Sequence, residues 1–247
     1  MIIETCEIAD VDDSAINCYT SKNMKGDIKS PVIQPVKRIV FCDFDGTITA
    51  DETFVSMIKH FTPEMFKKLA PEMYARRVTL KDGVRRLLES IPSKRYLEIL
   101  DFVRSKPIRA GLVEFLDFLE IPKVPCVLVS GGLRGMIEAV LGPLIKRFQA
   151  VYAIDLDISN EFFKVRSEYE GETEVVSKVK IMEQYNAEET VVIGDGVTDL
   201  NIALKASLVF ARDNLLDYLD ERGKPYIPWD TFFDIRDYLA DHWQVVE

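Results

Sequence analysis

The sequence predicts an α/β fold, a doubly wound and largely parallel Rossmann-like sheet with a helical segment inserted after its first strand. Three short apolar runs, at 38–42, 124–129 and 190–194, are each followed by small or oxygen-bearing residues and then by a helical pattern. The segment 52–106 repeats apolar residues at helical spacing and exceeds the ~10–15 residues of one crossover helix. The loops after the three strands should therefore meet at one sheet edge, where open α/β folds bind ligands.

The chain divides into three predicted parts. Residues 1–36 carry mixed charges without helical or strand periodicity and end in a proline-containing stretch, so we expect an N-terminal arm. Residues 37–51 and 107–247 should form the core that contains the sheet. Residues 52–106 should form a small helical subdomain over the sheet edge.

Three further segments complete the predicted core. The run 111–119 has apolar residues at helical spacing and should be the crossover helix that leads to the second strand. Between 151 and 169 apolar residues alternate on either side of Ser159-Asn160, which predicts a hairpin or a pair of strands. The stretch 174–185 is typical of a helix and directly precedes the third strand.

The composition is that of a globular protein that binds neither membranes nor nucleic acid. Of the 247 residues 47% are hydrophobic, and 41 acidic residues against 31 basic ones give a net charge of −10. This balance leaves no basic surface for nucleic acid or anionic lipid. No run approaches the ~20 apolar residues of a membrane helix, and no basic region precedes an apolar stretch at the N-terminus.

Cysteine and histidine usage argues against disulfides and zinc. The four cysteines, at 6, 18, 42 and 126, have no C-x-x-C spacing, and a chain of this length needs no disulfide bonds for stability. We therefore expect reduced thiols and a cytoplasmic location. His60 and His242 are too few, and wrongly spaced, for a zinc site of the Cys/His type.

Carboxylates follow two of the predicted strands. Asp43 and Asp45 end the first strand, where two such groups can divide the roles of nucleophile and general acid–base. Taken alone, this pair could also be a capping loop or a metal site. Asp195 and Asp199 follow the third strand and bring more negative charge to the same edge. This concentration of charge predicts a bound divalent cation, and the oxygen ligands favour Mg2+.

The second strand ends in residues that suit an anion. Ser130 offers a hydroxyl, and Gly131 and Gly132 offer unobstructed main-chain N–H groups at an expected helix start. A phosphoryl group beside four carboxylates also needs a cation nearby, which Lys178 or Lys180 can supply from the stretch before the third strand. Either lysine, taken singly, could be an ordinary exposed helical residue.

These four ordered motifs resemble those of the haloacid dehalogenase superfamily of phosphotransferases: DFDGT at 43–47, the serine of VSGG at 130, the lysine of SKVK, and GDGVTD at 194–199. The resemblance covers about 37 to 240 and implies that the helical insertion is a type IB cap. It implies that Asp43 attacks phosphorus to form an aspartyl-phosphate, and that Asp45 protonates the leaving group and then activates water. A carboxylate at position 45 goes with phosphatase activity in this superfamily.

The resemblance also implies which residues bind the metal and the substrate. The residues that would hold Mg2+ or support it are Asp43, Asp45 through its main-chain carbonyl, Asp195 and Asp199. The residues that would contact the phosphoryl group are Thr47, Ser130, Gly131 and Gly132. Lys178 is the better match to the motif lysine, with Lys180 as the alternative.

Two branches of this superfamily match further segments, and the substrate stays open between them. The segments 80–87, 208–216 and 226–236 resemble the methionine-salvage phosphatases that act on 2-hydroxy-3-keto-5-methylthiopentenyl-1-phosphate. Those enzymes carry a cysteine-rich insertion before the motif lysine, whereas this chain has no cysteine between 127 and 247.

Charged residues favour the phosphoserine phosphatase branch instead. Glu52, nine residues after Asp43, resembles the glutamate that meets the substrate ammonium, Arg86 resembles the cap arginine that pairs with its carboxylate, and Arg134 lies in a similar Ser-Gly-Gly-x-Arg context. Alternatively, Glu52 is an ordinary residue of the first turn of a helix, and the two arginines lie on solvated helix faces. Arg212 either borders the site or pairs with an acid.

The sequence thus predicts an enzyme that hydrolyses a small phosphate ester with Mg2+, as a monomer or homodimer, with no nucleic-acid or membrane partner. A non-enzymatic alternative is a receiver-like domain phosphorylated on aspartate, but receivers have ~120 residues and lack such a helical insertion. A Rossmann-type nucleotide binder is a third possibility, against which the absence of G-x-G-x-x-G after the first strand argues.

Overall fold

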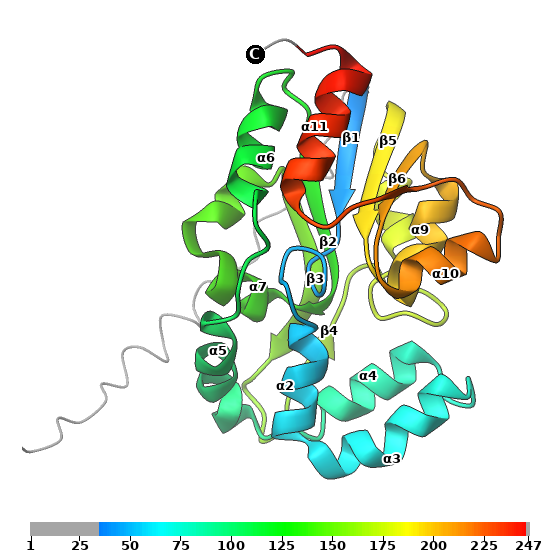
Figure 1. Ribbon diagram of the computed structural model, residues 1–247. Helices are drawn as coiled ribbons and strands as arrows, with labels where there is room; N and C mark the ends of the chain where they lie inside the picture. The colour runs from blue at the N-terminus through cyan, green and yellow to red at the C-terminus, as the bar shows by residue number, and fades with distance from the viewer. Residues whose placement is uncertain (1–34, 246–247) are drawn as a thin grey trace, which may run out of the picture. The chain divides into compact units, whose positions relative to one another are not determined.

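The structure is a computed structural model that describes residues 35–245. The arm predicted over 1–36 therefore lies outside the described residues, except for positions 35 and 36. Within 35–245 no helix has the length and apolar character needed to cross a membrane. The predicted α/β fold is confirmed, with helices arranged around a central sheet (Figure 1).

A seven-stranded sheet forms the centre of the fold, in the order β4-β3-β2-β1-β5-β6-β7. Its strands are β1 (Val36–Cys42), β2 (Cys126–Leu133), β3 (Ala150–Asp157), β4 (Lys164–Arg166), β5 (Ala187–Gly194), β6 (Leu208–Ala211) and β7 (Ile227–Pro228). Neighbouring strands are parallel except β3 and β4, which form the predicted antiparallel hairpin. The strand order reverses beside β1, and such a switch point opens a crevice at the carboxyl ends of the strands.

Alternating residues of the central strand face two separate layers of the core. In β1, Ile39 and Phe41 belong to one buried cluster, while Val40 and Cys42 belong to the other. Successive strand side chains point to opposite faces, so a strand covered on both faces needs an unbroken apolar run. The apolar run at 38–42 therefore belongs to a fully buried strand, as predicted.

Helices cover both faces of the sheet. On one face α6 (Leu112–Glu120) packs against α11 (Phe232–Trp243), with the rings of Phe115 and Phe232 5.4 Å apart. The helices that contribute to the cluster on the other face are α8 (Lys178–Met182), α9 (Leu200–Lys205) and α10 (Asn214–Asp220). Helix α7 (Arg134–Leu141) contributes apolar side chains to both clusters.

Helix α8 is shorter than the helix predicted over 174–185. It begins after Ser177, whose side chain accepts the main-chain N–H of Lys180 as an N-cap. The residues before it fold back on themselves instead of forming a helical turn: Ser177 N–H donates to the Tyr169 carbonyl at 2.8 Å, and Gly171 N–H to that of Glu174 at 2.9 Å. These loop hydrogen bonds replace the helical ones, so the predicted N-terminal boundary is wrong.

The segment inserted between β1 and β2 is mostly helical, as predicted. It contains α2 (Thr53–Phe61), α3 (Pro63–Tyr74), α4 (Leu80–Leu88), a 3-10 turn at Ser93–Arg95 and α5 (Tyr96–Arg104). These helices gather at the end of the molecule toward which the β1 arrow points (Figure 1). They therefore lie on the side of the sheet where the loops that follow β1 and β5 begin.

Candidate active site

A buried ion-pair cluster forms where β1 ends. Asp43 is the first residue after β1, and its main-chain N–H continues the strand pairing by donating to the Ile193 carbonyl of β5 at 3.0 Å. Lys178, the first residue of α8, donates its ammonium to the carboxylate of Asp43 and, at 2.6 Å, to that of Asp199. The exposed fractions of Asp43, Lys178 and Asp199 are 6%, 3% and 1%. The cluster thus joins three distant segments of the chain away from bulk solvent.

Three carboxylates in this cluster have the spacing of a metal site. One oxygen from each of Asp43, Asp195 and Asp199 lies within 4.8 Å of the others. Lys178 offsets one of the three negative charges, which leaves a net charge of −2 when all groups are ionised. Carboxylate oxygens are hard ligands that suit Mg2+, and a divalent cation would balance this charge.

Burial and neighbouring charges shift the pKa values of Asp43, Asp195 and Lys178. Burial raises the pKa of Asp43 well above its ordinary value, and Asp199 raises it further against the opposing effect of Lys178. Burial and Asp199 also raise the pKa of Asp195 to about 7. Burial would lower the pKa of Lys178, but Asp199 and Asp43 outweigh it and raise that pKa, so the ammonium stays charged. Carboxylates crowded in this way are the groups that a bound cation stabilises in the ionised form.

Hydrogen bonds distinguish Asp199 from the other two carboxylates. Its Oδ1 accepts from Lys178, and its Oδ2 accepts from the main-chain N–H groups of Asp195 and Gly196, each at 3.2 Å. By contrast, Oδ2 of Asp43 and Oδ2 of Asp195 accept no hydrogen bond from any residue within 35–245. These two oxygens are therefore the ones available to a cation, and Asp199 orients Lys178 and the Asp195 loop.

Asp45 stands apart from this cluster and is bound to the helical insertion. Its Oδ1 accepts a hydrogen bond of 2.9 Å from the main-chain N–H of Phe54, the second residue of α2. Burial raises the pKa of Asp45 to about 6, and nearby Glu52 raises it further, while the Phe54 hydrogen bond opposes the shift. A carboxyl group with a pKa close to neutrality can both give up and regain a proton.

Two glycines allow the carboxylates to crowd together. Gly46 has a φ of 77°, and a Cβ built on it would collide with Oδ2 of Asp195. A Cβ on Gly132 would lie 2.7 Å from Oδ2 of Asp45. A Cβ on Gly131 would meet nothing within 4 Å, so open space lies beside this residue.

The strand that carries Ser130 is longer than predicted. β2 continues through both glycines to Leu133, with an irregularity in its pairing with β3, and α7 begins only at Arg134. The expected helix start at the two glycines is therefore wrong. The N–H of Gly132 is not unobstructed either, because it donates to Oγ of Ser130 at 2.9 Å. Ser130 itself is 1% exposed, and its hydroxyl hydrogen is left to bind an acceptor.

Two predicted substrate-binding residues are engaged elsewhere. The buried hydroxyl of Thr47 donates to Oδ1 of Asp195 at 2.9 Å, so its hydrogen is committed to a carboxylate of the cluster. The guanidinium of Arg134 pairs with Asp155 at 2.7 Å and donates to the Val151 carbonyl at 3.0 Å. Both contacts of Arg134 are with β3, and the structure does not bring it to the carboxylate cluster.

Three predicted residues remain, namely Glu52, Arg86 and Lys180. Glu52 and Arg86 are exposed, and neither side chain makes a hydrogen bond or ion pair with any described residue. The exposed ammonium of Lys180 donates to the Glu170 carbonyl at 2.6 Å, outside the cluster. The lysine at the cluster is therefore Lys178.

Sequence reasoning missed Arg109, which precedes α6. Its guanidinium donates to the carbonyls of Gly46 and Thr47 at 2.7 and 2.8 Å, in the loop between Asp43 and the insertion. A single arginine in the segment KPIRAG carries no local signal of such a contact. Arg212 pairs with Asp213 at 2.8 Å, which agrees with the second of the two roles predicted for it.

These features agree with a known family. A family model of haloacid dehalogenase-like hydrolases matches residues 40–204, and the chain belongs to this family. It is 53% identical over 206 residues to the 2-hydroxy-3-keto-5-methylthiopentenyl-1-phosphate phosphatase of Microcystis aeruginosa (strain NIES-843 / IAM M-2473), covering 83% of this chain and 98% of that protein. It is 33% identical over 213 residues to the protein of the same name from Geobacillus kaustophilus (strain HTA426), covering 81% and 94%.

Solved structures support the same fold. A substrate-bound phosphoserine phosphatase matches with a TM-score of 0.61 and 21% identity, covering 82% of this chain and 98% of that one. A phosphoserine phosphatase holding a phospho-aspartyl intermediate analogue matches with a TM-score of 0.60 and 21% identity, covering 82% and 99%. At this identity the likeness concerns the fold. The predicted superfamily and its hydrolase class are thus confirmed.

Proposed function

We propose that this chain is a Mg2+-dependent phosphatase whose substrate is the small phosphate ester 2-hydroxy-3-keto-5-methylthiopentenyl-1-phosphate. The observation that carries this substrate is 53% identity along 98% of the length of a Microcystis protein named for that activity. Similarity of this extent includes the helical insertion as well as the motifs of the sheet edge. It therefore bears on the substrate more directly than the four motifs, which the whole superfamily shares.

Asp43 is the nucleophile of the first step. Its carboxylate is buried and held by Lys178, which supports one fixed orientation toward an incoming phosphorus atom. Attack by Asp43 breaks the bond between phosphorus and the ester oxygen and leaves an aspartyl-phosphate. Asp45 gives its proton to the departing oxygen, a role supported by its pKa of about 6.

Asp45 also serves the second step. Once ionised, it takes a proton from the water molecule that attacks phosphorus. The bond between phosphorus and the Asp43 carboxylate then breaks, so inorganic phosphate leaves and both carboxyl groups return to their starting states. One group can act first as an acid and then as a base because its pKa lies near neutrality.

The carboxylate cluster fits a divalent cation. Asp43 and Asp195 would hold Mg2+ through their unpaired Oδ2 atoms, together with the main-chain carbonyl of Asp45, while Asp199 keeps Lys178 in place. When bound, Mg2+ would offset the negative charge of the transferring phosphoryl group. Lys178 adds a second positive charge on the same side.

The phosphoryl group itself would lie beside the end of β2. The buried hydroxyl of Ser130 and the main-chain N–H of Gly131 are its proposed donors. The open space next to Gly131 supports this position, because no described side chain fills it. Gly132 contributes by leaving room for Asp45 rather than by donating to the phosphoryl group.

The helices of 52–106 are the proposed cap that closes over the substrate and excludes bulk water. The hydrogen bond between Phe54 and Asp45 supports this role, since it joins the first of these helices to the reaction centre. A cytoplasmic location and a monomeric or homodimeric state belong to the same proposal. The buried, unpaired thiols of Cys42 and Cys126 support a reducing compartment.

Phosphoserine is a second candidate substrate. The exposed side chains of Glu52 and Arg86 have no ion-pair partner within 35–245, so both charges are free for an ammonium and a carboxylate of a ligand. Bidentate contact with a carboxylate suits arginine. Arg134 does not support this candidate, because Asp155 already neutralises it.

A panel of phosphate esters tests the proposal directly. We expect the chain with Mg2+ to hydrolyse 2-hydroxy-3-keto-5-methylthiopentenyl-1-phosphate with a higher kcat/KM than phosphoserine or p-nitrophenyl phosphate. A higher kcat/KM for phosphoserine would favour the second candidate. No turnover of any ester, together with long-lived phosphorylation by acetyl phosphate, would refute the enzyme and favour a receiver-like role.

A further inference from the structure

Arg109 lies on the connection that returns from the helical insertion to the sheet, between α5 and α6. This connection pairs with the outgoing one along the main chain. The N–H of Ala50 donates to the Pro107 carbonyl at 3.0 Å, and the N–H of Arg109 donates to the Ile48 carbonyl at 2.8 Å. The two connections are therefore held side by side.

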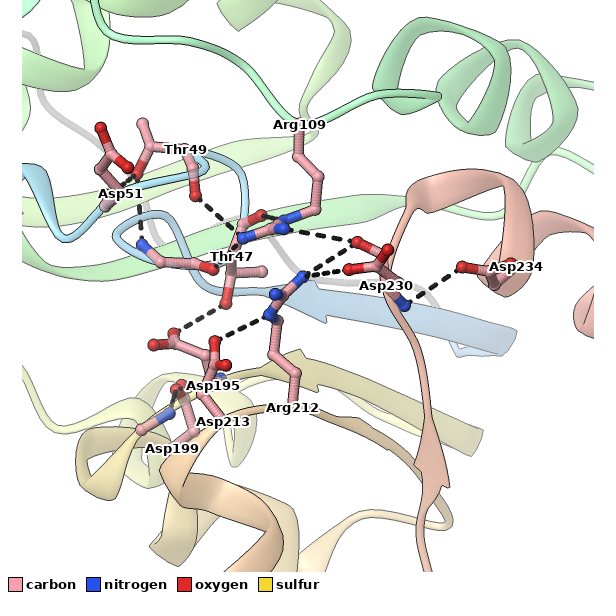
Figure 2. A network of polar contacts seen from close by, with 12 residues as sticks. Thr47, Thr49, Asp51, Arg109, Asp195, Asp199, Arg212, Asp213, Asp230 and Asp234 are labelled. Carbon is pink, nitrogen blue, oxygen red and sulfur yellow. Dashed lines mark hydrogen bonds and ion pairs between the residues drawn. The ribbon is translucent and has the colours of Figure 1, made fainter.

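The guanidinium of Arg109 binds the loop that follows the proposed nucleophile. Its Nε donates to the Thr47 carbonyl at 2.8 Å, and its Nη2 donates to the Gly46 carbonyl at 2.7 Å and to that of Thr49 at 3.4 Å. Figure 2 shows the side chain reaching across to this loop. The planar fork of arginine can fix several carbonyls in one arrangement, which the single ammonium of lysine cannot.

Thr47 contacts both Arg109 and Asp195. While its carbonyl accepts from Arg109, its hydroxyl donates to Oδ1 of Asp195 at 2.9 Å, so Thr47 lies between the two side chains (Figure 2). Thr47 is fully buried, so bulk solvent does not reach this hydroxyl. With Oδ1 occupied, Oδ2 of Asp195 is the oxygen left for a cation.

The electrostatic setting of Arg109 is unfavourable for a positive charge. Burial lowers its pKa, and the neighbouring guanidinium of Arg212 lowers it further, while Asp213, Asp230 and Asp195 oppose this shift. The two guanidinium groups lie over the same ring of Trp229, at 5.3 and 5.2 Å, and both donate to the Asp230 carbonyl. A positive charge placed beside a cation site also repels the cation. The contacts of the guanidinium with the 46–49 loop are the feature of Arg109 that a lysine could not reproduce.

We propose that Arg109 is a positioning residue for the metal site, fixing the 46–49 loop so that the Thr47 hydroxyl orients Asp195. This inference rests on the Mg2+-dependent function proposed above. A purely electrostatic role for Arg109 predicts that Arg109→Lys, which keeps the positive charge, binds Mg2+ as tightly as wild type. Weaker Mg2+ binding by Arg109→Lys therefore separates the two roles.

The test is a calorimetric titration of Mg2+ into the metal-free chain, without substrate. We expect Arg109→Gln to bind Mg2+ about tenfold more weakly than wild type, the usual effect of losing a group that orients a metal ligand. Arg109→Lys keeps the positive charge but loses the planar arrangement of donors. It should therefore also bind Mg2+ more weakly than wild type. The matched control is Arg212→Gln, which removes the neighbouring cation without touching the 46–49 loop and should bind at least as tightly as wild type.

A second variant tests whether Arg109 acts through Thr47. Thr47→Val removes the hydroxyl at nearly constant shape and should reproduce the loss of affinity. The double variant Arg109→Gln/Thr47→Val should lose no more than either single variant, because both changes interrupt one chain of contacts. Thermal unfolding of each metal-free variant establishes that it is folded. If Arg109→Gln is not folded, Arg109→Lys carries the test, alone and combined with Thr47→Val.

Three outcomes would overturn the inference: unchanged or tighter Mg2+ binding by Arg109→Gln, additive losses in the double variant, or a wild-type chain that binds no Mg2+. The last would also refute the proposed metal dependence. A wild-type chain that binds Mg2+ but hydrolyses no phosphate ester would refute the proposed function alone, and the affinity series would still decide the role of Arg109.

Discussion

The carboxylate of Asp45 accepts a hydrogen bond of 2.9 Å from the main-chain N–H of Phe54 near the start of α2. Glu52, which occupies the N-cap position of that helix, makes no side-chain capping hydrogen bond. Asp45 thus satisfies a helix N–H group from outside the helix, where a negative charge is also favoured by the helix dipole. The proposed acid–base group is therefore held by the first helix of the insertion as well as by the β1 loop.

The first prediction concerns the stability of Asp45→Asn in the metal-free protein. The folded-state pKa of about 6 lies above the ordinary 3.8, so the native state binds more protons than the unfolded state between these values. Its free energy of unfolding therefore falls as pH rises through this window. Asn keeps an acceptor for Phe54 and removes the charge, so we expect the variant to gain on the order of 2 kcal/mol at about pH 7.5 and little at about pH 4.

Urea unfolding with a chelator present measures this difference at both pH values. Hydrolysis by the variant should be lost, since Asn can neither give nor take the required proton. A gain in stability that is equal at the two pH values would show that the raised pKa is not its cause.

The second prediction is that Asp43→Asn abolishes activity without unfolding the chain. The amide oxygen can still accept from Lys178, but the side chain cannot attack phosphorus, so turnover should fall about a thousandfold or more. Steady-state hydrolysis and circular dichroism provide the two readouts. Asp101→Asn, an exposed change in α5, is the control and should retain full activity. Full activity of Asp43→Asn would contradict the nucleophile assignment.

The third prediction compares Lys178→Met with Lys180→Met. Removing the buried ammonium leaves Asp43 and Asp199 without their shared partner, so Lys178→Met should lose about 3 kcal/mol of unfolding free energy along with activity. Lys180 is exposed and donates to a single carbonyl, so its loss should cost less than about 1 kcal/mol. Chemical denaturation at neutral pH measures both, and equal losses would argue against the buried cluster.

The fourth prediction uses the two adjacent glycines of β2. Gly132→Ala places a Cβ 2.7 Å from Oδ2 of Asp45, so Asp45 must move and the stability of the metal-free chain should fall by about 1 to 3 kcal/mol. Gly131→Ala places its Cβ in open space and should leave stability within about 0.5 kcal/mol of wild type. The midpoints of urea unfolding of the two variants measure this difference. A larger loss of stability for Gly131→Ala than for Gly132→Ala would contradict the described geometry at the end of β2.

The fifth prediction concerns metal removal. Mg2+ that binds only the folded chain should stabilise it by about 2.7 kcal/mol at a hundred times its Kd, and a chelator should abolish both this gain and hydrolysis. Asp195→Asn removes the charge of one of the two carboxylates with an unpaired Oδ2, and should greatly reduce the Mg2+-dependent rise in Tm. Asp237→Asn, an exposed change in α11, should leave that rise intact. Equal responses of the two variants would place the cation elsewhere.

Local sequence patterns predicted the fold and the gathering of carboxylates at one sheet edge. The apolar run at 38–42 predicts a buried strand because a parallel strand covered on both faces needs apolar side chains at every position. The three strand-to-loop segments predict that Asp43, Ser130 and Asp195 come to one sheet edge, since parallel strands end on the same side. These conclusions depend on periodicity and connectivity, which are properties of the chain itself.

Only the tertiary structure decided which partner each polar side chain takes. It brings Lys178, and not Lys180, to Asp43 across 135 residues, directs the Thr47 hydroxyl to Asp195, and commits Arg134 to Asp155. It also brings Arg109 to a loop about 60 residues away, for which no local pattern exists. A hydrogen bond requires its two groups to lie within about 3 Å with a suitable angle. That geometry is set by how distant segments pack, so residue type and spacing along the chain can predict the groups of a site but not their pairing.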